Sequence, residues 1–130
     1  MMGKRQVLEG QGLPRHRNPT PAAVKIGNLV FSAAINGEDA ERETLPAEPA
    51  EQVAQAFCNL RRAIELMGGT TDDIAKVTVY LRDMAHRDLV NREWLSMFPD
   101  EHDRPVRHAI RADLQNNWVL QLEFIAVLSP

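Results

Sequence analysis

The segment Arg104-Pro105-Val106-Arg107-His108 carries the strongest indication of chemistry in this sequence. Proline fixes its own backbone angle and restricts the residue before it, so an arginine that enters a strand after such a stiffened loop has a defined position. Its planar guanidinium group matches a carboxylate through two parallel hydrogen bonds. The segment therefore predicts a carboxylate-binding arginine, with an internal ion pair as the alternative. His108 is expected on the opposite face of the strand.

The other reactive side chains give weaker signals. The histidines show no HxH or HxxxH spacing, so no metal site is predicted. The single cysteine, Cys58, excludes an internal disulfide and a zinc ribbon, and we expect it to pack near the flank of a helix. Gly68-Gly69 is expected to end a helix, because no phosphate-binding pattern accompanies it. A GxSxG nucleophile motif is also missing from the sequence.

Length and composition exclude several classes of protein. With 130 residues, 44% of them hydrophobic and 25% charged, the chain is expected to form one globular domain spanning residues 1–130. The net charge of −3 and the scattered Lys and Arg residues argue against a nucleic-acid partner, which would need a basic surface. No apolar run is long enough for a membrane span, and the first residues lack a signal-peptide core, so a cytoplasmic protein is expected.

The elements that must position Arg107 can be predicted from patterning. An edge strand is expected at residues 6–8, and Gly27-Asn28 between apolar runs predicts a hairpin over residues 23–32. Apolar residues at spacings of three and four predict a helix over 50–67, with Pro49 in its first turn. Alternation predicts a strand at 74–81, after which Asp83 could cap a second helix. Two further strands are expected at about 107–113 and 118–128.

Two helices on one face of a mixed sheet give an α+β fold. The last strand is unusual, because Val119, Ile125 and Val127 lie on the face opposite the predicted core, together with polar Gln121 and Glu123. A face in contact with water would carry more charge than this. We therefore expect another subunit to cover the outer face of the sheet.

Several segments together resemble the reactive-intermediate deaminase (Rid) family, whose members are also called endoribonuclease L-PSP proteins. In order along the chain, the matching segments are 24–31, 59–60, 74–84, 90–91, 104–107 and 121–127. They are spread over residues 24–127 of the chain.

The resemblance implies a chorismate-mutase-like fold and a barrel-forming homotrimer with clefts between the subunits. It implies hydrolysis of imines or enamines derived from amino acids, without a metal or an organic cofactor. Arg107 matches the family arginine that binds the substrate carboxylate, and Asn91 lies in a matching helix segment. An imine is already electrophilic, so a positioned water and a proton relay suffice.

The sequence departs from the family pattern at several site positions. Thr20 replaces an aromatic residue that helps to close the pocket, Ala34 replaces a glycine, and Ala109 stands where many members have cysteine. The glutamate often assigned to water activation aligns with Gln121, whose amide can orient water but cannot accept a proton at neutral pH. Glu123, two residues further on, is the retained carboxylate and could take over the activation of water. His108 is a second, weaker candidate for that role.

Three hypotheses follow from these residues. The first is a homotrimeric deaminase of a small imine or enamine acid, with Arg107 binding the carboxylate and Gln121 and Glu123 positioning water; a 2-aminomuconate-type substrate is one variant of it. The second is a non-catalytic trimer that binds a small carboxylate. The third, ribonuclease activity, is disfavoured by the acidic composition.

Overall fold

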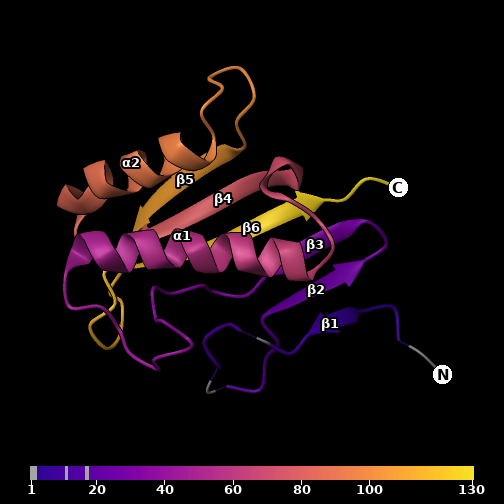
Figure 1. Cartoon of the computed structure of the whole chain (residues 1–130), viewed down its shortest axis with the longest axis horizontal. Coiled ribbons are helices and arrows are strands. Elements are labelled where there is room, and N and C mark those ends of the chain that lie inside the picture. The colour runs from indigo at the N-terminus through magenta and orange to yellow at the C-terminus, as the bar shows by residue number, and fades with distance from the viewer. Residues whose placement is uncertain (1–2, 11, 17) are drawn as a thin grey trace.

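The computed structural model describes residues 3–10, 12–16 and 18–130. Its core is a six-stranded sheet in the order β1-β2-β3-β6-β4-β5, in which β4 and β5 are parallel and all other neighbours are antiparallel. The strands are β1 (Gln6–Leu8), β2 (Ala23–Ile26), β3 (Leu29–Ser32), β4 (Ile74–Leu81), β5 (Val106–Arg111) and β6 (Leu120–Val127). The helices α1 (Pro49–Leu66) and α2 (Arg87–Met97) cover one face of this sheet (Figure 1).

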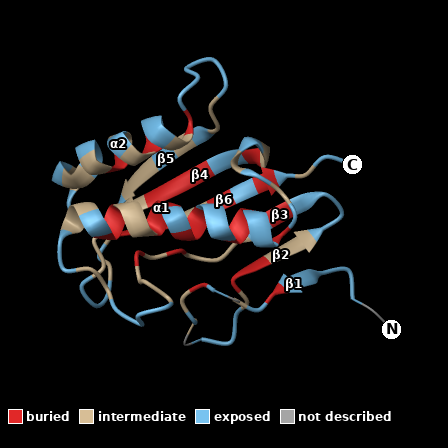
Figure 2. Cartoon of the chain, in the orientation of Figure 1, coloured by how far each residue is buried: buried red, intermediate tan, exposed pale blue. Residues whose placement is uncertain are grey.

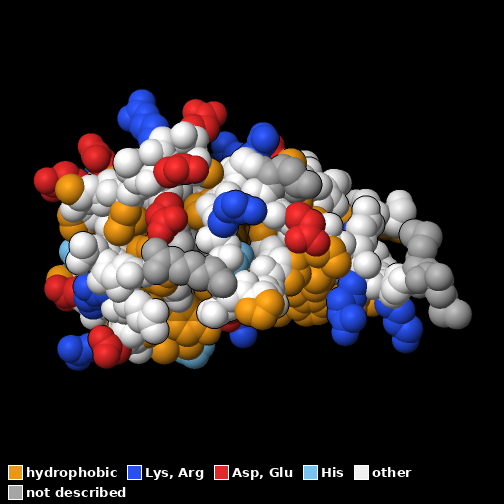
Figure 3. Space-filling model, turned by 90° about the horizontal axis from the view of Figure 1, so that it is seen from below, with side chains coloured by type: hydrophobic (Ala, Val, Ile, Leu, Met, Phe, Trp, Pro, Cys, Tyr) orange, Lys and Arg blue, Asp and Glu red, His pale blue; other side chains and the backbone are white. Residues whose placement is uncertain are grey.

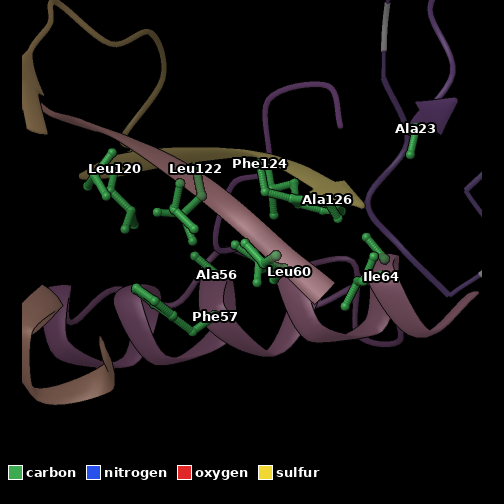
Figure 4. Close-up of a cluster of buried hydrophobic side chains, with 14 of the residues drawn as sticks. Ala23, Ala56, Phe57, Leu60, Ile64, Leu120, Leu122, Phe124 and Ala126 are labelled. Carbon is green, nitrogen blue, oxygen red and sulfur yellow. The ribbon is translucent and has the colours of Figure 1, made fainter. Parts of the chain in front are cut away.

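The core lies between α1 and the centre of the sheet. Leu120, Leu122, Phe124 and Ala126 project from β6 toward α1, which presents Ala56, Phe57, Leu60 and Ile64 (Figure 4). This arrangement follows from the two periodicities in the sequence, because alternate strand residues share one face and helix residues three or four apart share another. Buried positions accordingly recur along α1 and β4 in Figure 2.

The opposite face of the sheet is exposed and apolar over its β3–β6 part. Leu29 and Phe31 of β3 pair with Val127 and Ile125 of β6, and all four side chains are exposed. The prediction of an apolar outer face is confirmed for Ile125 and Val127 but is wrong for Val119. Val119 precedes β6 and packs partly buried against the core, because its backbone N–H donates to the Gln52 side chain.

Most predicted elements are confirmed, including the α+β architecture, the hairpin at Gly27-Asn28 and the end of α1 at Gly68, whose φ is +91°. Four details differ. Asp83 caps a 3₁₀ turn (Met84–His86) that precedes α2, so it does not cap the helix itself. The strand expected at 107–113 ends at Arg111, the strand expected at 118–128 is shorter at both ends, and Cys58 is exposed on α1.

Candidate active site

Arg107 lies on the helix-covered face of β5, against one side of α2. Its Nη2 donates to Oδ1 of Asn91 at 2.6 Å, and its guanidinium carbon lies 5.0 Å from the ring centroid of Trp94. Within residues 3–10, 12–16 and 18–130, no carboxylate pairs with it, and Nη1 is buried without a hydrogen-bond partner. Arg107 is therefore held in place by neutral groups, and its charge is left available for an anion.

The electrostatics of Arg107 fit this description. Burial, and to a lesser extent the positive charge of Arg87, lowers the pKa of Arg107 from its usual value. An arginine nevertheless stays protonated at all ordinary pH values. The group is thus a permanent cation in a partly dry environment, where a charge-assisted hydrogen bond to a ligand carboxylate is stronger than in water.

The positions of these residues follow from the β4–α2–β5 connection. Asn91 and Trp94 lie three residues apart on α2 and so share one face, and β5 runs parallel to β4 with Arg107 opposite Val77. Ala109 lies two residues beyond Arg107 on the same strand face, and it is partly buried against the core. Asn91, Arg107 and Ala109 therefore form one group on the helix-covered face.

A second group lines a cleft of about 530 Å³ at the loop end of the molecule. Three predicted site residues line it, Thr20, Ala34 and Gln121. The cleft is also lined by residues from three loops: Arg15, Asn36, Glu38, Asn116 and Trp118. A side-chain hydrogen bond from Trp118 Nε1 to Glu38 Oε1, at 3.3 Å, links two of these loops.

Buried amides of α1 hold the cleft loops in position. Asn59 donates from Nδ2 to the carbonyl oxygens of Asn36 and Glu38, both at 2.9 Å. Gln52 donates to the carbonyls of Pro46 and Asn117 and accepts from the N–H of Val119. Gly37 fits between these contacts because a Cβ there would collide with the backbone of Gln52. The shape of the cleft therefore depends on polar groups in the otherwise apolar face of α1.

Arg82, at the end of β4, holds the loop between β5 and β6. Its Nη2 donates to the carbonyl oxygens of Leu114, Gln115 and Asn116, and Asn116 has a positive φ of 56°. These residues form one wall of the cleft. The loop thus depends on a single guanidinium group for much of its backbone hydrogen bonding.

Glu123 lies on the open face of the sheet, like Gln121, but it does not line the cleft. The hydroxyl of Tyr80 donates to Glu123 Oε1 at 3.0 Å. This hydrogen bond, followed by desolvation and the charge of Glu123, raises the pKa of Tyr80 above its usual value. The two groups form an acid–base pair next to Gln121, which is the register partner of Tyr80.

The structure divides the predicted site residues between two faces of one chain. Arg107, Asn91 and Ala109 lie on the face covered by the helices, whereas Gln121 and Glu123 lie on the open face. His108 is exposed on the open face, opposite Thr78, as expected. A single chain therefore does not bring the carboxylate-binding group and the water-positioning group together.

Several residues of these two groups are not predictable from local patterning. Trp94 has no predicted role in the site, although its spacing from Asn91 on the helix could have indicated its position against Arg107. The roles of Arg82, Gln52 and Asn59 had no local signal, because each of these side chains binds backbone carbonyls distant in the sequence.

Neither a metal-binding cluster nor a membrane-spanning helix is present in the described part of the chain. Residues 3–10, 12–16 and 18–130 contain no group of three or more His, Cys, Asp or Glu that could hold a metal ion. No helix in that part of the chain is long and apolar enough to cross a membrane. On the face shown in Figure 3, Lys and Arg side chains are scattered among acidic ones and do not form a continuous basic surface.

The family model for endoribonuclease L-PSP proteins matches residues 14–128. The chain belongs to this family. A RutC family protein of Haemophilus influenzae is 30% identical over 125 residues, which cover 94% of this chain and 96% of that protein. The chain is also similar to the 2-iminobutanoate/2-iminopropanoate deaminase of Escherichia coli, with 25% identity over 94% of this chain and 97% of that protein.

Solved structures agree with the L-PSP assignment and with the fold. RidA from the Antarctic bacterium Psychrobacter superimposes with a TM-score of 0.88 at 27% identity, covering 95% of this chain and 100% of that one. The predicted chorismate-mutase-like α+β fold of this family is thereby confirmed.

Proposed function

We propose that this L-PSP family protein hydrolyses a small imine or enamine carboxylic acid and releases ammonia, at sites that are completed between the subunits of a homotrimer. The observation that carries this proposal is the charged Arg107, which is fixed by Asn91 and Trp94 and has no carboxylate partner in the described chain. Relatives that are named 2-iminobutanoate/2-iminopropanoate deaminase support the same reaction.

The reaction needs few groups. Arg107 binds the substrate carboxylate, and water adds to the imine carbon while the imine nitrogen gains a proton. The resulting carbinolamine loses ammonia and leaves a keto acid, so one water is consumed for each ammonia released. Gln121 would orient the water, and Glu123, coupled to Tyr80, would accept a proton. Thr20, Ala34 and Ala109 would shape the pocket around the substrate.

The division of the site residues supports a site shared between subunits. Arg107 and Gln121 lie on opposite faces of the sheet in one chain, and β5, which carries Arg107, is an edge strand. The exposed apolar residues of β3 and β6 provide a surface for association. In a trimer, the Arg107 group of one subunit would face the Gln121 cleft of its neighbour.

The test measures imine lifetime. Imines of short, branched and aromatic amino acids are generated with an amino-acid oxidase and trapped with semicarbazide, with and without the protein. We expect faster imine loss with the wild type and not with Arg107→Ala. The matched control is Arg92→Ala, which removes an exposed arginine from α2 that pairs with Glu93. Equal turnover by Arg107→Ala and wild type would refute the assignment.

A second function, carboxylate binding without turnover, is favoured by one observation. The resemblance to the family aligns Gln121 with the expected general base and Ala109 with a frequent cysteine. A binding site needs Arg107 but no base. Saturable, Arg107-dependent carboxylate binding without hydrolysis of any imine, including an aminomuconate-type enamine, would select this function. Salt-sensitive RNA binding would instead support a ribonuclease.

A further inference from the structure

We infer that the site selects a substrate with two acid groups, and that Arg87 is the specificity-determining residue that binds the second one. This inference rests on the proposed role of Arg107 as the ligand of the first carboxylate. Whether the bound molecule is then hydrolysed or only held does not affect it.

The geometry places Arg87 beside the Arg107 group. Arg87, Asn91 and Trp94 lie at i, i+4 and i+7 on α2 and therefore follow one face of the helix. The other two members of this stripe both contact Arg107, at 2.6 Å through Asn91 and by stacking on Trp94. Arg87 is thus the residue of α2 that continues the Arg107 site by one helical turn, and its side chain is exposed.

The charges are not balanced within the chain. Neither Arg87 nor Arg107 takes part in any ion pair between described residues. The nearest acidic residue along the helix is Asp88, but adjacent helix positions do not face each other. The charge of Arg87 is close enough to Arg107 to lower its pKa. Two cations therefore act on each other without an anion between them.

A ligand with one carboxylate neutralises only one of these two charges. A ligand with two carboxylates neutralises both, and it removes the repulsion between the guanidinium groups at the same time. Arg87 and Arg107 together therefore favour ligands with two carboxylates over ligands with one. An apolar side chain on the substrate would instead leave Arg87 without a partner.

The test compares glutarate with butyrate, which have similar carbon skeletons and differ by one carboxylate. Dissociation constants are measured by calorimetry on the assembled protein, with its oligomeric state checked in the same sample. We expect the wild type to bind glutarate at least about tenfold more tightly than butyrate. Arg87→Gln should remove most of this ratio, and Arg87→Lys should restore part of it. Arg92→Gln, which removes a charge from another face of the same helix, should keep it.

The outcomes separate the two proposals. Equal affinity for glutarate and butyrate in the wild type, or an unchanged ratio in Arg87→Gln, overturns the role of Arg87 and leaves Arg107 as a carboxylate ligand. Loss of both ligands in Arg107→Ala but not in Arg87→Gln confirms that the proposed site was probed. If neither ligand binds the wild type at millimolar concentration, both the inference and the carboxylate site on which it rests are wrong.

Discussion

Tyr80 and Glu123 form the one close acid–base pair on the open face of the described sheet, with 3.0 Å between the phenol oxygen and Oε1. The carboxylate accepts the phenol proton in a hydrogen bond, and a second negative charge would arise beside it if the phenol ionised. Both effects favour the neutral phenol. The titration of Tyr80 therefore reports on its hydrogen bond to Glu123.

We predict that the phenol titrates above its ordinary pKa of 10.0 and that Glu123→Gln moves the midpoint down. Tyr80 is the only tyrosine, so absorbance at 295 nm follows this single group. Because the folded pKa is raised, the stabilisation by this pair is present below pH 10.0 and is lost as the pH rises through the folded value. Identical midpoints in the wild type and in Glu123→Gln would contradict the hydrogen bond.

Among single residues, sequence reasoning could single out Arg107 as a candidate because a proline-stiffened loop and a family segment both point to it. It could not identify the contact between Asn91 and Arg107, since that contact depends on the rotation of α2 relative to β5. The exposure of Cys58 was also missed. Cys58 lies beside the apolar stripe of α1, and the sequence does not show which side of that stripe faces the solvent. The structure shows that the side with Cys58 is exposed.

Among the elements, α1 combines an apolar face with two buried amides that hold loops. Gln52 is only 2% exposed, and its side chain makes hydrogen bonds to Pro46, Asn117 and Val119. A hydrophobic residue of the same size would bury well but would leave these backbone groups without partners. Since each unpaired buried group costs about 1–3 kcal/mol, the loops depend on this side chain.

We predict that Gln52→Leu lowers the free energy of unfolding by about 3 kcal/mol. Denaturant unfolding measures this change, and hydrogen exchange should become faster in the loop at 112–119. The control is Gln55→Leu on the same helix, which removes one partly exposed hydrogen bond to Asn59 and should cost less than about 1 kcal/mol. An equal effect of the two substitutions would show that the hydrogen bonds of Gln52 do not stabilise the loops.

The regular elements were predictable because hydrophobic periodicity alone defines them, as in the alternation of β6 and the spacing along α1. The segments between them follow other rules. The start of β6 shifts from Trp118 to Leu120 because Val119 donates to Gln52 and Trp118 donates to Glu38. Asp83 caps a 3₁₀ turn since its carboxylate accepts from Ala85, one turn before α2 begins. Such side-chain contacts do not appear as a periodic pattern in the sequence, so they could not be predicted from it.

For the whole molecule, the open sheet face determines how subunits would associate. Phe31 and Ile125 face each other across β3 and β6 and are 39% and 37% exposed. Burial of these side chains between subunits would stabilise an oligomer through the hydrophobic effect. An aspartate in place of Phe31 would bring a negative charge into this interface without a positively charged partner.

We predict that the wild type sediments as a homotrimer of three 14.6 kDa chains and that Phe31→Asp sediments as single folded chains. Leu95→Asp is the control. The side chain of Leu95 is also apolar and is 52% exposed, but it lies on α2, away from the open face of the sheet. Analytical ultracentrifugation measures the mass, and circular dichroism verifies folding. A trimer that persists in Phe31→Asp would show that the open face is not the interface.

The two tryptophans of the chain have separate positions, Trp94 beneath the guanidinium of Arg107 and Trp118 in the wall of the cleft. Indole emission depends on nearby charge and on water, so each ring acts as an optical probe of one group of site residues. A carboxylate bound at Arg107 changes the field at Trp94, whereas a molecule that fills only the cleft changes the surroundings of Trp118. Emission spectra of Trp94→Phe and Trp118→Phe would therefore show, without any label, which part of the site a given compound occupies.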